Sequence, residues 1–173
     1  GGCVAYSGGV VIDTELMKSM SLDRTQRTAT VGAGALKNEL NAFLEPHGFI
    51  FGPDPSSNPS IGGMASTGGS GLSTLKYGTS KENIVSMKVV TPKGDVIETR
   101  RNVRKNSTGY DLNALYLGAE GTLGVITELT VKLFPIPKTR VGAVVQFETV
   151  KDAAETVVLA RNANLETLLR CEM

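Results

Sequence analysis

The chain of 173 residues has few of the side chains that build metal and hydrolytic sites. Its two cysteines, Cys3 and Cys171, lie near opposite ends, which argues against a disulfide framework or a zinc cluster, and we expect both to be free thiols. A single histidine, His47, leaves no Ser, His and Asp set for acyl transfer. The acidic residues show no pair spaced for acid–base work, so the sequence offers no catalytic residue.

An excess of charge of one sign is also lacking. The 18 Lys and Arg stand against 17 Asp and Glu, so no large basic field attracts nucleic acid or an anionic membrane. The longest apolar runs, such as Val141–Phe147, are too short to cross a bilayer, and none follows a basic start as in a secretory signal. We expect a globular protein with no nucleic-acid partner and no transmembrane segment. Because it opens at Gly1-Gly2-Cys3, we also expect it to be part of a longer protein.

The first third of the chain mixes strand and helix patterns. The β-branched runs Gly9–Asp13 and Thr28–Val31 predict strands. The apolar spacing over Leu36–Leu44 predicts a helix with one apolar face, which Gly48 ends. His47 directly precedes that glycine, and we assign it a helix-end role, in which a partly positive imidazole favours the helix dipole, rather than catalysis.

The middle of the chain reads as antiparallel sheet. Val85–Val90 and Val96–Thr99 flank a Pro-Lys-Gly-Asp turn and predict a hairpin. Alternating apolar residues over Thr122–Phe134 predict a further sheet segment. Pro135 and Pro137 then interrupt it, because proline cannot donate to a ladder.

A second unit is expected after these prolines, which divides the chain into residues 1–137 and 138–173. Val141–Phe147 predicts a strand, Thr149 is a candidate N-cap for a helix, and Leu165–Leu169 predicts another strand. We interpret this β-α-β order as the beginning of a substrate-binding cap domain.

The segment Gly52–Gly71 is the strongest candidate for a site. It sets six glycines among prolines and serines, so it cannot be regular structure throughout. Main chain without side chains can approach a diphosphate closely and adopt positive φ angles. The spacing fits neither G-x-G-x-x-G nor a P-loop. On composition alone, a flexible Gly/Ser loop is an equal alternative.

The order of three motifs resembles a known family. The run Gly62–Gly71 followed by Tyr77-Gly78, then Lys105–Leu112, then Leu117–Thr127 is similar to the vanillyl-alcohol-oxidase superfamily. The match lies in the branch of the FAD-linked D-lactate and D-2-hydroxyglutarate dehydrogenases and glycolate oxidase. Weaker similarity extends over Gly8–Asp13 and Asn41–Gly48.

The resemblance implies an α+β FAD-binding domain of vanillyl-alcohol-oxidase (PCMH) type, of which this is the second subdomain, followed by the start of an α/β cap. It implies FAD as cofactor and no metal site in this chain. One group of residues would line the pyrophosphate and isoalloxazine, and the other would reach the adenosine end. The first group is Pro53, Asp54, Gly62, Gly63, Ser66, Thr67, Tyr77 and Gly78, and the second is Glu120, Gly121, Gly124, Val125 and Ile126.

The resemblance also implies what the whole protein does. A D-2-hydroxy acid would pass a hydride to FAD, and a separate acceptor would take the electrons, in the bacterial cytoplasm or the mitochondrion. The family's first glycine-rich loop would precede Gly1-Gly2, and its catalytic and metal-binding histidines would follow residue 173, so this chain alone should bind FAD weakly at most.

The basic cluster at Arg100, Arg101, Arg104 and Lys105 is interpreted as a solvated connection. Two alternatives stay open: a non-catalytic binding module, or an oxidase of phenols, sugars or other alcohols.

Overall fold

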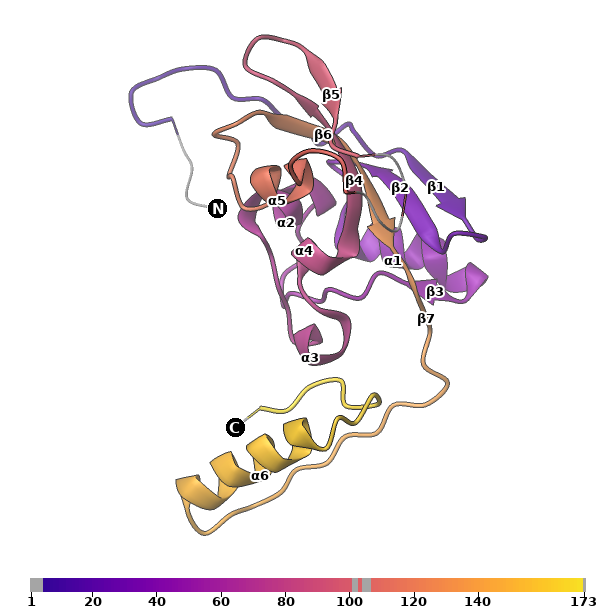
Figure 1. The fold of residues 1–173 in the computed structure, drawn as a ribbon, viewed down its shortest axis with the longest axis vertical. Helices are drawn as coiled ribbons and strands as arrows, with labels where there is room; N and C mark the ends of the chain where they lie inside the picture. The colour runs from indigo at the N-terminus through magenta and orange to yellow at the C-terminus, as the bar shows by residue number, and fades with distance from the viewer. Residues whose placement is uncertain (1–4, 101–102, 104–106, 173) are drawn as a thin grey trace.

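The computed structural model describes residues 5–100, 103 and 107–172, and its ribbon shows a mixed body of strands and helices followed by a separate helical segment (Figure 1). A five-stranded antiparallel sheet has the order β1-β2-β6-β4-β5, and β3 pairs with β7 in a small second sheet. The predicted α+β class is confirmed. The strands are β1 (Met20–Asp23), β2 (Thr28–Gly32), β3 (Phe49–Ile50), β4 (Ile84–Val90), β5 (Val96–Glu98), β6 (Val125–Lys132) and β7 (Phe134–Pro135); the helices are α1 (Lys37–Leu44), the 3-10 turn η1 (Glu45–His47), α2 (Ile61–Thr67), α3 (Thr74–Tyr77), α4 (Ser80–Asn83), α5 (Leu112–Tyr116) and α6 (Val150–Asn162).

The hydrophobic core lies on one face of the large sheet. Leu129 of β6 stands between Val31 of β2 and Met87 of β4, and all three side chains are buried. One residue along, Thr30 and Thr130 pair on the opposite face with their hydroxyls 3.1 Å apart. Successive strand residues point to opposite faces, so the predicted period of two over this segment is confirmed from the start of β6.

Helix α1 forms where the apolar spacing predicted it. Leu40 and Leu44 are fully buried in the core. The amide of Leu36 donates to the Glu39 carboxylate at 3.0 Å, which satisfies one unpaired group at the helix start. Gly48 follows η1 with φ of 78°, a left-handed conformation that glycine adopts at no steric cost. It closes the η1 turn rather than α1 itself.

The hairpin prediction is confirmed, and the prediction at the prolines needs a correction. Strands β4 and β5 pair antiparallel with Val90 opposite Val96. Pro135, in contrast, lies inside β7 opposite Phe49 of β3. The interruption falls at Leu133, between β6 and β7. Pro135 can lie in β7 because a short edge strand tolerates a proline whose missing N–H is not needed by the ladder.

Three predicted strands are wrong. Gly9–Asp13 is not a strand, and Val10 and Val11 are 90% and 81% exposed. Val141–Phe147 and Leu165–Leu169 are also without strand structure. The β-branched residues favour extended backbone, but a strand needs a neighbour to pair with, and within the described residues none of these segments finds one.

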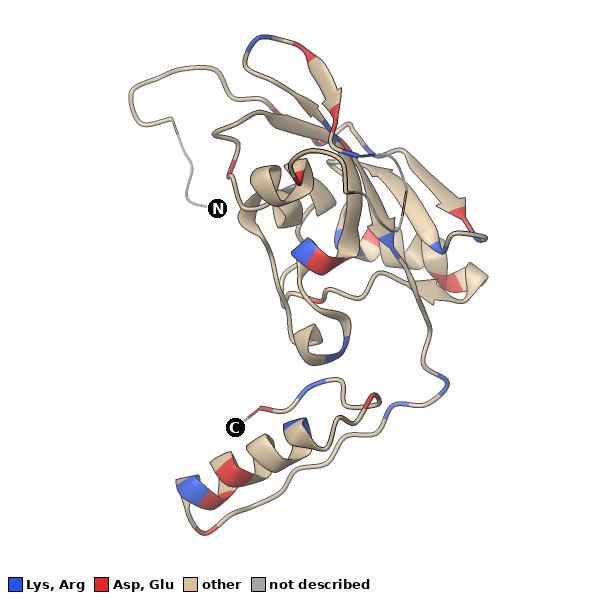
Figure 2. Ribbon diagram, in the orientation of Figure 1, with Lys and Arg blue, Asp and Glu red and all other residues tan. Residues whose placement is uncertain are grey.

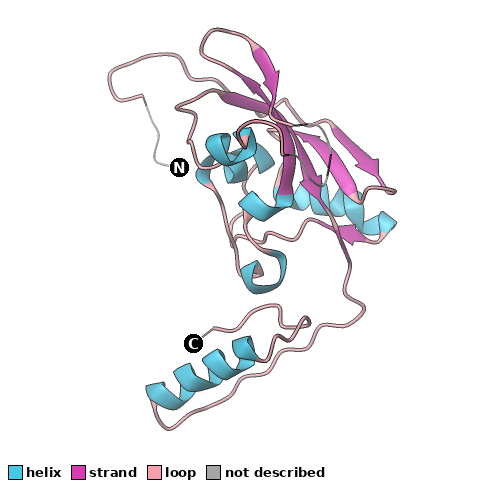
Figure 3. Cartoon of the chain, in the orientation of Figure 1, coloured by secondary structure: helices cyan, strands magenta, loops and turns pink. Residues whose placement is uncertain are grey.

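The last helix confirms the rest of the prediction for that region. Helix α6 begins at its predicted N-cap, since the Thr149 hydroxyl accepts a hydrogen bond of 3.1 Å from the amide of Asp152. Figure 3 shows α6 set apart from the sheet and joined to it by a long extended segment. None of its described side chains is fully buried.

His47 lies at the end of η1, the helix-end position that the sequence predicted. The Arg24 guanidinium lies 2.6 Å from His47 Nδ1. Since a guanidinium can only donate, Nδ1 is the acceptor in this contact. Cys171 is unpaired, whereas Cys3 lies outside the described residues.

The distribution of charged residues and the apolar character of the helices agree with the expectations from the sequence. Basic and acidic residues are interspersed over the ribbon rather than gathered by sign (Figure 2). None of the helices in the described part of the chain has the length and apolar character needed to cross a membrane. Among these residues, no group of three or more His, Cys, Asp or Glu could hold a metal ion.

Candidate functional site

The glycine-rich segment contains helix α2, which the sequence pattern did not predict. Ser60 is its N-cap, and the Ser60 hydroxyl accepts from the amide of Gly63 at 3.1 Å. The amide of Gly62 donates to the carbonyl of Ala33 at 2.9 Å. A Cβ on Gly62 would lie 2.7 Å from the Ala33 Cβ, so this glycine lets α2 pack directly against the chain leaving β2. A phosphate would have to compete with these protein partners for both amides.

The end of α2 is bonded to the loop that precedes β6. The amide of Gly118 donates to Ala65 O at 3.0 Å, and the amide of Glu120 donates to Ser66 O at 2.9 Å. Two of the predicted motifs, far apart in the sequence, therefore share one surface. We call the main chain of residues 66–68 and 118–121 the glycine cradle.

The glycine cradle presents bare main chain to open space. Gly68, Gly118 and Gly121 have φ of 63°, 78° and 79°, values at which an L side chain is strained. No atom lies within 4 Å of a Cβ built on Gly118 or Gly121. Glu120 also has a positive φ, 50°, and such outliers cluster at binding sites. The atoms of a bound ligand can approach this backbone closely, while the amides of Gly68, Gly118 and Glu120 already donate to protein carbonyls.

The turn at Asp54 connects the glycine-rich segment Gly52–Gly71 to helix α1. The Lys37 ammonium, which is 8% exposed, lies 2.9 Å from Asp54 Oδ1 and donates to Pro55 O at 2.9 Å. The carbonyl of Asp54 accepts from the amide of Leu72 at 3.1 Å. A Cβ on Gly71 would fall 2.1 Å from the Asp54 carbonyl carbon, so the two backbones are in direct contact.

Tyr77 and Gly78 lie at the end of helix α3, after the glycine-rich segment. The Tyr77 ring is buried against Phe134, with centroids 4.6 Å apart, and next to Gly52. Burial raises the pKa of the Tyr77 phenol, and the Arg140 guanidinium opposes part of that rise. The phenol therefore stays neutral at physiological pH. Gly78 has φ of 78° and ends α3.

A capping box fixes the backbone that follows Gly78. Glu82 accepts from the Thr79 hydroxyl at 2.6 Å and from the Thr79 amide at 2.7 Å. These bonds, the hydroxyl first and the amide second, lower the pKa of the Glu82 carboxyl.

The capping box gives a prediction about pH. A lowered folded-state pKa means that Glu82 stabilises the fold above the ordinary titration range of glutamate, near pH 4, and that this contribution is lost as the pH falls through the folded pKa. We expect E82Q to unfold more readily at pH 7, with a smaller stability loss between pH 6 and pH 3 than the parent. Urea unfolding at several pH values measures this. Equal slopes against pH in both proteins would contradict it.

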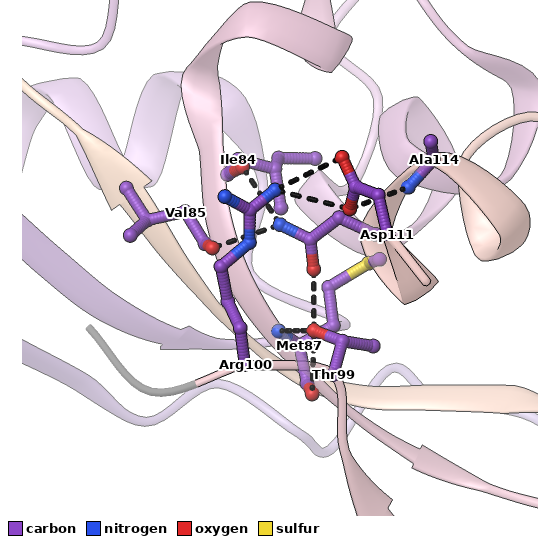
Figure 4. Close-up of polar contacts among 8 residues, drawn as sticks. Ile84, Val85, Met87, Thr99, Arg100, Asp111 and Ala114 are labelled. Carbon is purple, nitrogen blue, oxygen red and sulfur yellow. Dashed lines mark hydrogen bonds and ion pairs between the residues drawn. The ribbon is translucent and has the colours of Figure 1, made fainter. Parts of the chain in front are cut away.

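A buried polar network holds α5, and with it the loop that leads into the cradle (Figure 4). Asn113 donates to Val85 O at 2.8 Å and to Ile84 O at 3.2 Å, both on β4. Its amide oxygen accepts from the Thr99 hydroxyl, which in turn accepts from the Met87 amide at 2.9 Å.

An exposed ion pair lies beside this network. Arg100 contacts Asp111 at 3.1 Å, and Asp111 is the N-cap of α5, accepting from the Ala114 amide at 3.3 Å. Asp111 therefore has a structural role at the start of α5. The other three members of the basic cluster, Arg101, Arg104 and Lys105, lie outside the described residues.

The predicted site residues fall into three groups. Ser66, Thr67, Glu120 and Gly121 come together at or beside the cradle. Gly124 adjoins β4, since its Cβ would lie 2.7 Å from Val90 O. The remaining members are arranged as follows: Gly62 and Gly63 lie in the first turn of α2, Pro53 is buried and Asp54 exposed beside Lys37, Tyr77 and Gly78 lie at the end of α3, and Val125 and Ile126 begin β6.

Sequence reasoning missed several residues that support the site. Four buried polar side chains bind backbone carbonyls of other segments: Lys37, Ser80, Asn83 and Asn113. Ser80 bonds Gly69 O at 2.7 Å. No short pattern in the sequence separates these residues from exposed polar ones; Lys37, for example, is followed by the polar Asn38 and Glu39.

The α+β fold, with glycine-rich main chain from two distant segments on one surface, is that of a domain suited to a nucleotide-type cofactor. The family model described as FAD binding domain matches residues 1–100, more than half of the chain, and the protein belongs to this family of FAD-binding domains. This confirms the predicted fold and cofactor. The cradle fits such a cofactor, because side chains on its glycines would fill the space that a dinucleotide needs.

The similar curated proteins are dehydrogenases and oxidases of hydroxy acids by name. The chain is 44% identical over 167 residues to the mitochondrial D-lactate dehydrogenase [cytochrome] of Arabidopsis thaliana, covering 96% of the chain and 30% of that protein. It is 36% identical over 159 residues to the glycolate oxidase subunit GlcD of Bacillus subtilis, covering 91% and 34%. The chain thus spans about a third of the length of these relatives.

A solved structure shows the same fold. Alkyldihydroxyacetonephosphate synthase matches with a TM-score of 0.66 and 35% identity, over 73% of this chain and 23% of that one. The resemblance to the vanillyl-alcohol-oxidase superfamily is therefore confirmed, in the branch of the D-2-hydroxy-acid enzymes.

Proposed function

We propose that the full-length protein carrying this chain is an FAD-dependent dehydrogenase of a D-2-hydroxy acid such as D-lactate. The glycine cradle carries the proposal, because it gives the chain a surface for the cofactor. The names of the relatives support the substrate class. FAD, when bound, supplies the hydride acceptor for the oxidation.

The residues of this chain would bind and orient the cofactor rather than react. The main chain of the cradle would bind the adenosine end through Glu120 and Gly121, with the strand backbone at Val125 and Ile126 beside it. The segment from Pro53 to Thr67, with Tyr77 and Gly78, would line the pyrophosphate and isoalloxazine. The neutral Tyr77 phenol can donate a hydrogen bond without adding negative charge near the ring.

The segment from residue 138 onward would begin a cap domain over the substrate. Helix α6 supports this, because apolar residues such as Val158 and Leu159 remain 55% and 68% exposed and call for further packing partners. A base outside this chain would take the substrate's hydroxyl proton. The cytochrome and the mitochondrion in the names of some relatives support a separate electron acceptor and an intracellular location.

One experiment tests the proposed function directly. The full-length protein should purify with a visible flavin spectrum, and anaerobic addition of D-lactate or another D-2-hydroxy acid should bleach it. The L-enantiomer is the matched control and should leave the flavin oxidised. A folded, colourless protein that takes up no added FAD would end the proposal. Flavin that binds but is bleached only by phenols, sugars or other alcohols would replace the substrate class.

A further inference from the structure

Lys37 has an environment that packing alone does not explain. Its side chain is 8% exposed at the first residue of α1, although a lysine head group ordinarily stays in water. Burying an ammonium is costly unless it is paired and hydrogen-bonded. Here it is paired with Asp54 Oδ1 and bonded to Pro55 O, each at 2.9 Å.

The ion pair is asymmetric, which points to a ligand on the Asp54 side. The Asp54 side chain is 54% exposed, whereas its partner is buried. One carboxylate oxygen is therefore fixed by the ammonium, and the group as a whole still reaches the surface. Because the ammonium balances its charge, such a carboxylate can accept a hydrogen bond beside a diphosphate with little repulsion of that anion.

The same turn is rigidly tied to the glycine-rich segment. The amides of Lys37 and Asn38 bond Pro59 O at 3.0 Å and Asn58 Oδ1 at 2.9 Å, so α1 holds both ends of the residue 54–59 turn. On the other side, Asp54 O accepts from Leu72. Lys37 therefore contacts, through Asp54, the segment that is expected to line FAD.

We propose that Lys37 is a positioning residue of the cofactor site: its ammonium holds the Asp54 carboxylate in place, and that carboxylate accepts a hydrogen bond from a hydroxyl group of bound FAD. This inference rests on the proposed cofactor role. Lys37 does not touch the cofactor itself. Its effect passes through the carboxylate and the turn.

The test compares variants of the full-length protein by FAD affinity, flavin absorbance spectrum and reduction potential. K37M keeps much of the apolar volume and removes the charge, and we expect FAD to bind roughly tenfold or more weakly, as befits loss of a hydrogen bond to a charged group. K37R should restore most of the affinity and the parent spectrum. D54N should weaken FAD binding by a similar factor, and K37M combined with D54N should be no worse than either alone.

A matched control lies at the same end of α1. Lys18 and Glu39 form an exposed ion pair at 2.9 Å, so K18M removes a comparable charge pair without touching the turn, and it should leave affinity and spectrum unchanged. Parent-like FAD affinity, spectrum and potential in D54N would overturn the inference, even if K37M fails to fold. Additive losses in the double variant would also overturn it. A parent protein that binds no FAD would instead contradict the proposed function.

Discussion

Replacing Gly71 with alanine is expected to destabilise the protein by about 3 kcal/mol and to weaken FAD binding strongly. The added Cβ would lie 2.1 Å from the carbonyl carbon and 2.2 Å from the carbonyl oxygen of Asp54. These are backbone atoms, and Lys37 anchors their turn, so the neighbour cannot move aside cheaply. Thermal unfolding of the apo protein and FAD titration measure the two effects.

The control for this substitution is Gly142→Ala. Its Cβ would meet no atom within 4 Å, and its φ is not in the left-handed region, so stability and FAD binding should stay close to the parent values. If G71A unfolded like G142A, the close contact between the residue 71 backbone and Asp54 would be absent from the folded protein.

Asn113→Ala is expected to cost about 3 kcal/mol, because the carbonyls of Ile84 and Val85 lose their amide donor and the Thr99 hydroxyl loses its side-chain acceptor. Helix α5 should then loosen on the sheet, and the loop from Leu117 into the cradle should lose its fixed start. We therefore expect weaker FAD binding as well as lower stability. Urea unfolding and FAD titration of the full-length protein measure both.

Asn113→Asp separates hydrogen bonding from volume. The aspartate keeps the oxygen that faces Thr99 but, when ionised, places a charge against Ile84 O and Val85 O. Because those carbonyls raise its folded pKa, the variant should lose stability relative to the parent as the pH rises from the ordinary titration range of aspartate through that folded pKa. The control is Leu115→Ala on the exposed side of the same helix, which should change stability by no more than about 0.5 kcal/mol. Equal effects of L115A and N113A would refute the role of the network.

Local patterns predicted much of the sheet and the ends of the helices. The alternation in β6, the β4–β5 hairpin and the Thr149 cap each depend on residues within a few positions of one another. The same local rules failed for Gly9–Asp13 and Val141–Phe147, because strand formation depends on a partner that periodicity does not reveal. Helix α2 was missed because its two glycines and Ser60 read as loop residues, whereas close packing against Ala33 stabilises it as a helix.

The sequence by itself determined the family and the cofactor, because the order of the glycine-rich motifs is written along the chain. Only the tertiary structure decided how those motifs meet. The bonds from Gly118 and Glu120 to the end of α2, and the burial of Lys37 against Asp54, join residues that no short pattern connects. Such contacts follow from how the sheet and helices pack, which is a property of the whole fold and not of any one segment.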